Sequence, residues 1–229
     1  MTPQMGLLFS AIAFVGTHFL FSHPLRGPLV RGMGEKAFRG LYSLIALITL
    51  GSMIYYYRII GREPSLWNAG DAGWIAGTLL MWLASVLLVG SFIGNPALPG
   101  ARGPTGGPQG VFRITRHPMM WSFALWAAVH LTILAMPKAL VFDGAIILLA
   151  LAGAAGQDRK KAALMGDSWH EWTAETAFVP FTRGLAYPGT VAFVGGTLLF
   201  LIATWARGCL ALDRLAALKR RNDTQVLRH

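Results

Sequence analysis

Two histidines inside apolar segments are the residues of this sequence that could do chemistry. The 229-residue chain has six histidines, and His18 and His130 lie within long runs of apolar residues. A polar side chain in hydrocarbon needs a partner, so an ionisable residue inside a membrane span is a candidate functional residue. His130 is the stronger candidate, because an unbroken apolar, Trp-rich stretch precedes it.

The chemistry that such a pair could do depends on its partners. Two neutral imidazoles from different helices would suit the iron of a haem packed among apolar side chains. A hydrogen bond between helices is the alternative explanation for each histidine. The helix that starts at Pro118 places His130 roughly 18 Å along its axis, whereas His18 lies only about 6 Å from the end of its own apolar run. Tilt or a longer first span must therefore close the gap, and His23 with His117 at the membrane surface is the competing pair.

His117 has a more polar setting than His130. Arg116 precedes it, Pro118 begins a helix after it, and Trp121 follows on the same helical face. His117 and His130 lie roughly 140° apart around that helix, so they cannot share one small ligand. We expect His117, Arg116 and Trp121 to contact an anionic headgroup, a propionate or a phosphate at the helix N-terminus, with simple capping at the interface as the alternative.

The composition predicts that membrane helices position these side chains. Hydrophobic residues make up 54% of the chain and charged residues 13%, whereas soluble domains carry about 25% charged residues. The predicted fold is therefore an all-α, polytopic transmembrane helical bundle with interfacial helices. About six spans are expected, over residues 5–22, 40–60, 73–93, 118–135, 139–155 and 188–205.

The polar segments predict the rest of the organisation. Pro24 and Pro28 argue against a simple helical continuation after the first span, and residues 157–187 predict an interfacial helix. We divide the chain into a transmembrane domain, residues 1–187, and a last span with a basic amphipathic tail, residues 188–229. The first span has no basic segment before it, which predicts that it is not a cleaved signal peptide.

The net charge of +10 comes from basic residues in the loops and the tail. In a membrane protein this charge favours contact with anionic lipid, so membrane lipids and not nucleic acid are the expected partners. The basic loops after the first, third and fifth spans should face the cytoplasm. With six spans, the basic C-terminal tail would then lie outside, which conflicts with the rule that basic segments stay on the cytoplasmic side. The single cysteine excludes an internal disulfide.

Three segments carry a resemblance to a known family. They are GTHFLFSHPLRGPLVRGMGEKAFRGLYSLIALITL near the start, ITRHPMMWSFALWAAVHL, and the later DRKK…W…VPF pattern. Over roughly residues 5 to 185 the chain resembles the NnrU family of bacterial inner-membrane proteins, whose relatives include the 15-cis-ζ-carotene isomerases of plants and cyanobacteria. The resemblance implies a multi-pass protein of the bacterial inner (cytoplasmic) membrane.

The resemblance also implies a cofactor and its ligands. The isomerase relatives hold haem b between histidines of the membrane bundle, and its redox state controls their activity. By this likeness His18 and His130 are the expected axial ligands of the metal, and His117 corresponds to the histidine of the family's Arg-His-Pro triplet. We add His23, Arg116 and Trp121 as expected cofactor contacts from their positions in the sequence, and His23 is the competitor of His18. The expected ligand is a hydrophobic polyene undergoing cis–trans isomerisation, or a diatomic gas, since NnrU proteins are associated with nitric oxide and nitrite metabolism in denitrification.

Two alternatives stay open. The Arg-His-Pro loop, the tight helical hairpin and the following polar segment are similar to isoprenylcysteine carboxyl methyltransferases, which bind S-adenosylmethionine. That family usually has a glutamate pair after the hairpin, where this chain has Gln157 and Asp158. The second alternative is a non-catalytic assembly or regulatory partner of a respiratory or denitrification complex, which would need neither ligand.

Overall fold

The computed structural model describes residues 1–96, 104 and 106–206 of the chain. Helices are its only regular elements over these residues, which confirms the predicted all-α fold. The long helices are α1 (Pro3–Ser22), α2 (Arg26–Ile59), α3 (Gly70–Gly90), α4 (Pro118–Leu134) and α5 (Pro137–Met165), followed by an apolar helix over Thr190–Ala206. Two short elements, η1 (Gly110–Arg113) and α6 (Asp167–Glu175), lie in the connections.

The six predicted spans correspond to these six apolar helices. Four of them, α1, α2, α3 and α5, are long and apolar enough to cross a membrane, whereas α4 and helix 190–206 are shorter. The predicted interfacial helix appears as α6, which buries Trp169 and Trp172. The predicted amphipathic tail lies outside the described residues, and the domain boundary at residue 187 stays a prediction.

The first helix does not simply continue, as predicted, because α1 ends at Ser22 and residues 23–25 form a turn, but the loop expected after it is largely helical. The structure places residues 26–33 in a helix, and the chain changes direction at Gly34, whose φ of 81° breaks the helical geometry inside α2. Pro28 is tolerated because it lies in the first turn, where its missing N–H loses no hydrogen bond. The fifth span is also longer than predicted, because its helix continues through Gln157–Lys161 to Met165.

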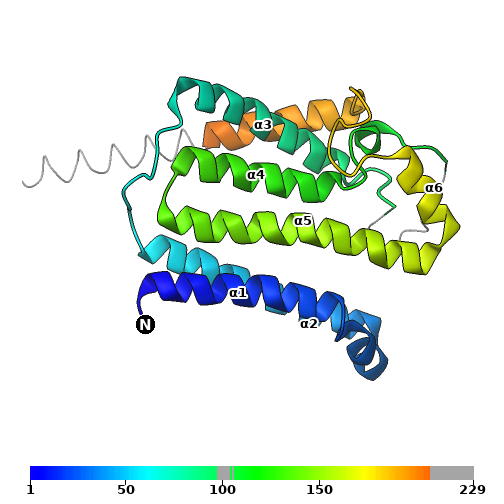
Figure 1. Cartoon of the computed structure of the whole chain (residues 1–229), viewed down its shortest axis with the longest axis horizontal. Helices are drawn as coiled ribbons and strands as arrows, with labels where there is room; N and C mark the ends of the chain where they lie inside the picture. The colour runs from blue at the N-terminus through cyan, green and yellow to red at the C-terminus, as the bar shows by residue number, and fades with distance from the viewer. Residues whose placement is uncertain (97–103, 105, 207–229) are drawn as a thin grey trace, which may run out of the picture.

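The helices pack side by side, and not every pair of consecutive helices packs together (Figure 1). The helices α1 and α2 form one antiparallel pair, α4 and α5 form a hairpin, and α5 lies against α1 while α3 lies against α4. Helix 190–206 packs on α3, where Trp82 donates its indole N–H to Thr197 Oγ1 at 2.9 Å. A Cβ on Gly196 would lie 2.4 Å from Val86 Cα, so this contact brings the two backbones close together.

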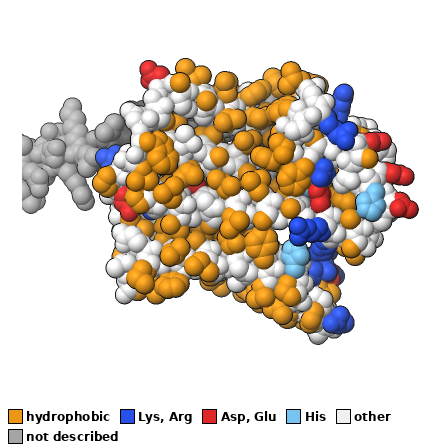
Figure 2. All heavy atoms as spheres, viewed as in Figure 1, with side chains coloured by type: hydrophobic (Ala, Val, Ile, Leu, Met, Phe, Trp, Pro, Cys, Tyr) orange, Lys and Arg blue, Asp and Glu red, His pale blue; other side chains and the backbone are white. Residues whose placement is uncertain are grey.

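The two ends of the bundle differ in charge. Figure 2 shows hydrophobic side chains along the helices and Lys and Arg side chains gathered mostly at the end where α6 lies. That end also holds the C-terminus of α1 and the N-terminus of α4 (Figure 1). Many large apolar side chains point outward, among them Leu47 on α2 and Ile75 on α3. This outer surface is that of a protein surrounded by lipid.

Candidate functional site

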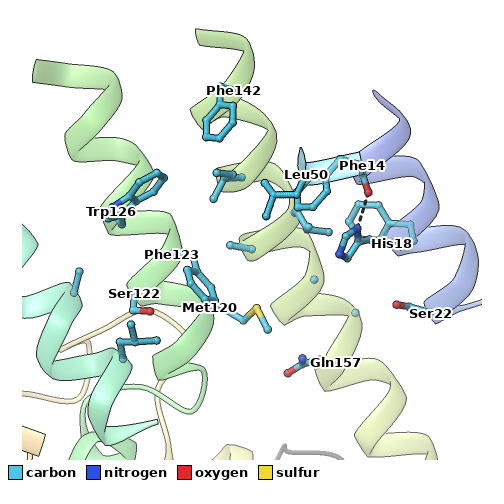
Figure 3. Close-up of a pocket in the computed structure, with 18 of the residues that line it drawn as sticks. Phe14, His18, Ser22, Leu50, Met120, Ser122, Phe123, Trp126, Phe142 and Gln157 are labelled. Atoms are coloured by element: carbon cyan, nitrogen blue, oxygen red, sulfur yellow. Dashed lines mark hydrogen bonds between the residues drawn. The ribbon is translucent and has the colours of Figure 1, made fainter. Parts of the chain in front are cut away.

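The main candidate site is a cavity of about 750 Å³ inside the helical bundle. One wall comes from α1 and α2, the opposite wall from α3 and α4, and the floor from α5 (Figure 3). Its volume lies within the range of about 300–1,000 Å³ that is usual for small-molecule sites. The apolar lining includes Phe14, Phe19, Leu50, Ile54, Met81, Ala84, Leu88, Met120, Phe123, Trp126, Phe142, Ile146, Leu149 and Ala150.

The cavity is long and has unlike ends. Phe142 and Lys160 both line it from α5, and their separation along that helix is roughly 27 Å at about 1.5 Å per residue. Figure 3 shows Phe142 at one end of the lining and Gln157 and Ser22 towards the other. The cavity thus runs from an apolar end near Phe142 to a polar end near the charged end of the bundle.

His18 is the predicted metal ligand that lines this cavity. Its Nδ1 lies 2.6 Å from the carbonyl oxygen of Phe14, one turn earlier on α1. A carbonyl can only accept, so Nδ1 carries a proton, and in the neutral tautomer this leaves the lone pair on Nε2. The ring also makes edge contacts with Phe14 and with Tyr42, whose centroids lie 4.5 and 5.4 Å away. His18 therefore has a defined tautomer and a defined orientation (Figure 3).

His130 has the same local arrangement in a different place. Its Nδ1 lies 2.8 Å from the carbonyl oxygen of Trp126, and the two ring centroids are 4.2 Å apart. Trp126 lines the cavity, but His130 is not among the described residues that do. His18 and His23 both line this cavity, whereas His130 does not line it.

The Arg-His-Pro histidine forms a separate cluster at the charged end. His117 is 3% exposed, and its Nε2 lies 2.8 Å from Oδ1 of Asp158 on α5. Arg116 donates to the same carboxylate from Nε and Nη2, at 2.9 and 2.7 Å to Oδ2. His117 Nδ1 has no hydrogen-bond partner within the described part of the chain. We call these three residues the Arg116–His117–Asp158 cluster.

The same cluster holds the segment that follows α6. Arg116 donates its backbone N–H to the carbonyl of Ala177 at 2.8 Å and places its guanidinium 5.3 Å from the Phe178 ring centroid. Thr115 and Trp121 both donate to the carbonyl of Phe178, at 2.7 and 2.8 Å. Three predicted cofactor contacts, His117, Arg116 and Trp121, therefore lie together and fasten α4, α5 and the segment after α6.

Asp158 and Lys160 are the site residues that the sequence prediction did not include. The prediction treated Asp158 only as a replacement for a glutamate in another family, although a buried Arg-His pair needs an acceptor. Both residues could have been placed from the sequence, because the helical pattern of the fifth span continues through residues 157–161. No group of three or more His, Cys, Asp or Glu side chains that could hold a metal ion occurs in residues 1–96, 104 and 106–206.

Comparisons with known proteins agree with this architecture. The family model described as NnrU protein matches residues 6–211. The chain is 24% identical over 191 residues to a protein of Arabidopsis thaliana named 15-cis-zeta-carotene isomerase, chloroplastic. That alignment covers 79% of this chain and 50% of the relative, so the chain spans about half the relative's length. No solved structure matches the chain significantly. Because the family match extends from α1 through the last apolar helix, the chain belongs to the NnrU family.

Proposed function

We propose that this NnrU-family protein binds haem b in the intramembrane cavity and isomerises a cis double bond of a long polyene lipid. The observation that carries the proposal is His18, which lines a long apolar cavity with its Nε2 free of the hydrogen bond made by Nδ1. The name of the Arabidopsis relative supports isomerisation as the reaction class. The positively charged end of the bundle supports a cytoplasmic orientation of that end in a bacterial inner membrane.

The donor set of the cavity fits a haem. Haem iron needs one or two axial ligands from the protein, because the porphyrin supplies the others. His18 would hold the haem through Nε2, in the tautomer that the hydrogen bond to the Phe14 carbonyl favours. When bound, haem b would supply iron that changes oxidation state and interacts with a lipid double bond or a diatomic gas.

The residues around His18 would perform the remaining tasks. Phe14 and Tyr42 hold the imidazole ring from two sides. Phe123 and Trp126 on the opposite wall exclude water and offer flat apolar surfaces against which a conjugated chain can lie. The length of the cavity approaches the hydrocarbon thickness of about 30 Å, so an extended chain can enter it without folding.

Ligation by both His18 and His130 would need a different helix arrangement. His130 lies roughly 12 Å deeper than His18 when each is measured from the charged end of its helix, which corresponds to about two helical turns. We therefore propose that His18 would hold the haem in this helix arrangement and that His130 would not.

The test is the visible absorption spectrum of protein expressed with haem supplied, before and after reduction with dithionite. Wild-type protein should show a Soret band that shifts on reduction, and His18→Ala should lose it. His170→Ala, on the exposed face of α6, is the matched control and should keep full haem content. Loss of haem in His130→Ala but not in His18→Ala would contradict the assignment, and a colourless wild-type protein would reject the haem proposal.

A role in nitric oxide metabolism is the second candidate, and it uses the same site. Among the described residues, the wall opposite His18 contains Met120, Phe123 and Trp126 but no histidine, so a haem held by His18 would meet a mostly apolar wall where a small uncharged gas could bind. Addition of nitric oxide to the reduced protein should then change the spectrum without any polyene. Isomerisation of an added cis-polyene, measured by chromatography, would favour the first proposal.

A further inference from the structure

We propose that the polar mouth of the cavity, formed by His23, Gln157 and Lys160, binds a carboxylate of the molecule whose apolar part fills the cavity. The inference rests on the cavity of the proposed function and narrows its occupant to an acidic amphiphile. A hydrocarbon without a polar group could form no hydrogen bond or ion pair with these three side chains. These three residues line the cavity together, next to Ser22 and Gly156.

Lys160 differs from the cations around it. Arg26 is paired with Glu35 at 2.9 Å, and Arg116 is paired with Asp158 at 2.7 Å. Lys161 donates to the carbonyl of Pro96 at 3.3 Å. Lys160 has no hydrogen bond or ion pair to any part of the chain that the structure describes, and it lines the cavity. Arg159 is likewise without such a partner among the described residues, but it is exposed and does not line this cavity, so Lys160 is the described Lys or Arg side chain that an anion bound there would meet.

The neighbouring carboxylates do not compete for Lys160. Glu35 accepts from Arg26 at 2.9 Å and from Arg39 at 3.2 Å, and Asp158 accepts from Arg116 and His117. Both acidic groups are therefore already matched with positive or hydrogen-bonding partners. Glu35 acts on Lys160 through charge at longer range, so a ligand carboxylate would be the first acidic group within ion-pair distance of Lys160 among the described residues.

His23 and Gln157 complete the mouth from opposite elements. The His23 ring packs on α5 at Gly156, where an added Cβ would lie 3.1 Å from both Cε1 and Nε2 of the ring. Gln157 is the next residue of α5, and its amide lies at the polar end of the lining (Figure 3). An imidazole N–H and an amide NH₂ are donors that can accompany an ammonium group around one carboxylate.

The position of the mouth fits the shape of an amphiphile. It lies at the charged end of the bundle, where lipid headgroups and water meet the protein. The rest of the cavity extends from there towards Phe142 and is lined by apolar residues. The carboxylate can come from two sources, a polyunsaturated lipid acid or the propionates of a haem, and the chemistry at Lys160 is the same for both.

The lipid arm of the test uses cis-parinaric acid, a fluorescent conjugated tetraene acid, and its methyl ester. Haem-free protein in nanodiscs is titrated with each probe, and empty nanodiscs give the background. Wild-type protein should bind the acid more tightly than the ester, and Lys160→Gln should weaken acid binding about tenfold while leaving the ester unchanged. Lys161→Gln, which removes the adjacent cation outside the cavity lining, should change neither.

The haem arm uses haem b and haem dimethyl ester with the same three proteins, followed by absorption. If Lys160→Gln weakens binding of haem b but not of parinaric acid, the mouth binds propionates. If it weakens binding of parinaric acid, the mouth binds a lipid acid. Either result supports the inference. Equal binding of acid and ester in wild type, or equal effects of Lys160→Gln and Lys161→Gln, would overturn it. Wild-type protein that binds no haem but prefers parinaric acid would reject the haem function and leave the carboxylate site standing.

Discussion

His117 and His18 lie in two regions of one bundle and use opposite ring nitrogens. His117 is bound through Nε2 to Asp158, a residue of another helix, inside a closed cluster. His18 is bound through Nδ1 to a carbonyl of its own helix, and its other nitrogen belongs to an open cavity. His117 thus links two helices through a carboxylate, whereas His18 makes its hydrogen bond within one helix and lines the cavity.

Substitutions in the two regions should therefore change different properties, the stability of the fold in one region and ligand binding in the other. Changes in the Arg116–His117–Asp158 cluster should alter the stability of the fold, because its members join α4, α5 and the segment after α6. Changes around the cavity should alter ligand binding while the fold persists, because few packed atoms are lost there.

The largest effect on stability is expected for Asp158→Ala. The substitution removes the acceptor of Arg116 and of His117, whose side chain is only 1% exposed. Removal of one partner from a buried ion pair typically destabilises by about 3 kcal/mol or more. We expect a large fall in the thermal unfolding midpoint in detergent, followed by tryptophan fluorescence. Glu171→Ala on the exposed face of α6 is the control, and an equal shift in both variants would show that the cluster does not stabilise the fold.

The next effect is expected at the contact between α3 and helix 190–206. In Gly196→Ala the new methyl carbon would lie 2.4 Å from Val86 Cα, so one helix must move away. Overpacking of this kind costs about 1–3 kcal/mol. Gly144→Ala on α5 is the matched control, because a Cβ there meets no atom within 4 Å. The unfolding midpoint should fall for Gly196→Ala alone, and a fall of the same size in both variants would show that this seam tolerates a side chain.

Helix positions were predictable because a span is a property of consecutive residues. The six apolar runs form six helices, and the errors lay where composition is ambiguous, in residues 26–39, which are helical where a loop was expected, and in the extension of α5 past residue 155. The partner of His117 was not predictable in the same way, because Asp158 is 41 residues away and pairs with it only after α4 and α5 have formed their hairpin. His18 was predictable as a candidate from its apolar surroundings, but the cavity that it faces exists only between helices.

A smaller loss of stability is expected for Trp121→Phe. The phenyl ring keeps most of the packing against Phe178, but the indole hydrogen bond to the Phe178 carbonyl disappears. That carbonyl still accepts from Thr115, so the loss should be about 1 kcal/mol. Since Trp121 does not line the cavity within the described residues, haem content should stay at the wild-type level. Reduced haem content with an unchanged unfolding midpoint would instead return Trp121 to the cofactor site.

The smallest effect on stability is expected inside the cavity, at Gly153. A Cβ at this position meets no atom within 4 Å, although Gly153 is part of the cavity lining. Gly153→Met should shift the free energy of unfolding by less than about 1 kcal/mol, because replacement of a helical glycine offsets any new crowding. The same side chain would occupy volume that the ligand needs, so binding of the uncharged methyl ester of cis-parinaric acid should fall severalfold.

Gly51→Met is the matched control for this last comparison. Gly51 lies on the exposed face of α2, where an added Cβ also meets nothing within 4 Å, and it does not line the cavity among the described residues. It should therefore leave binding of the ester unchanged. Because the ester carries no charge, this experiment measures the apolar part of the cavity separately from the polar mouth. Equal ester binding by Gly153→Met and wild type would mean that the probe binds elsewhere. The cavity would then differ from the Arg116–His117–Asp158 cluster in packing but not in ligand binding.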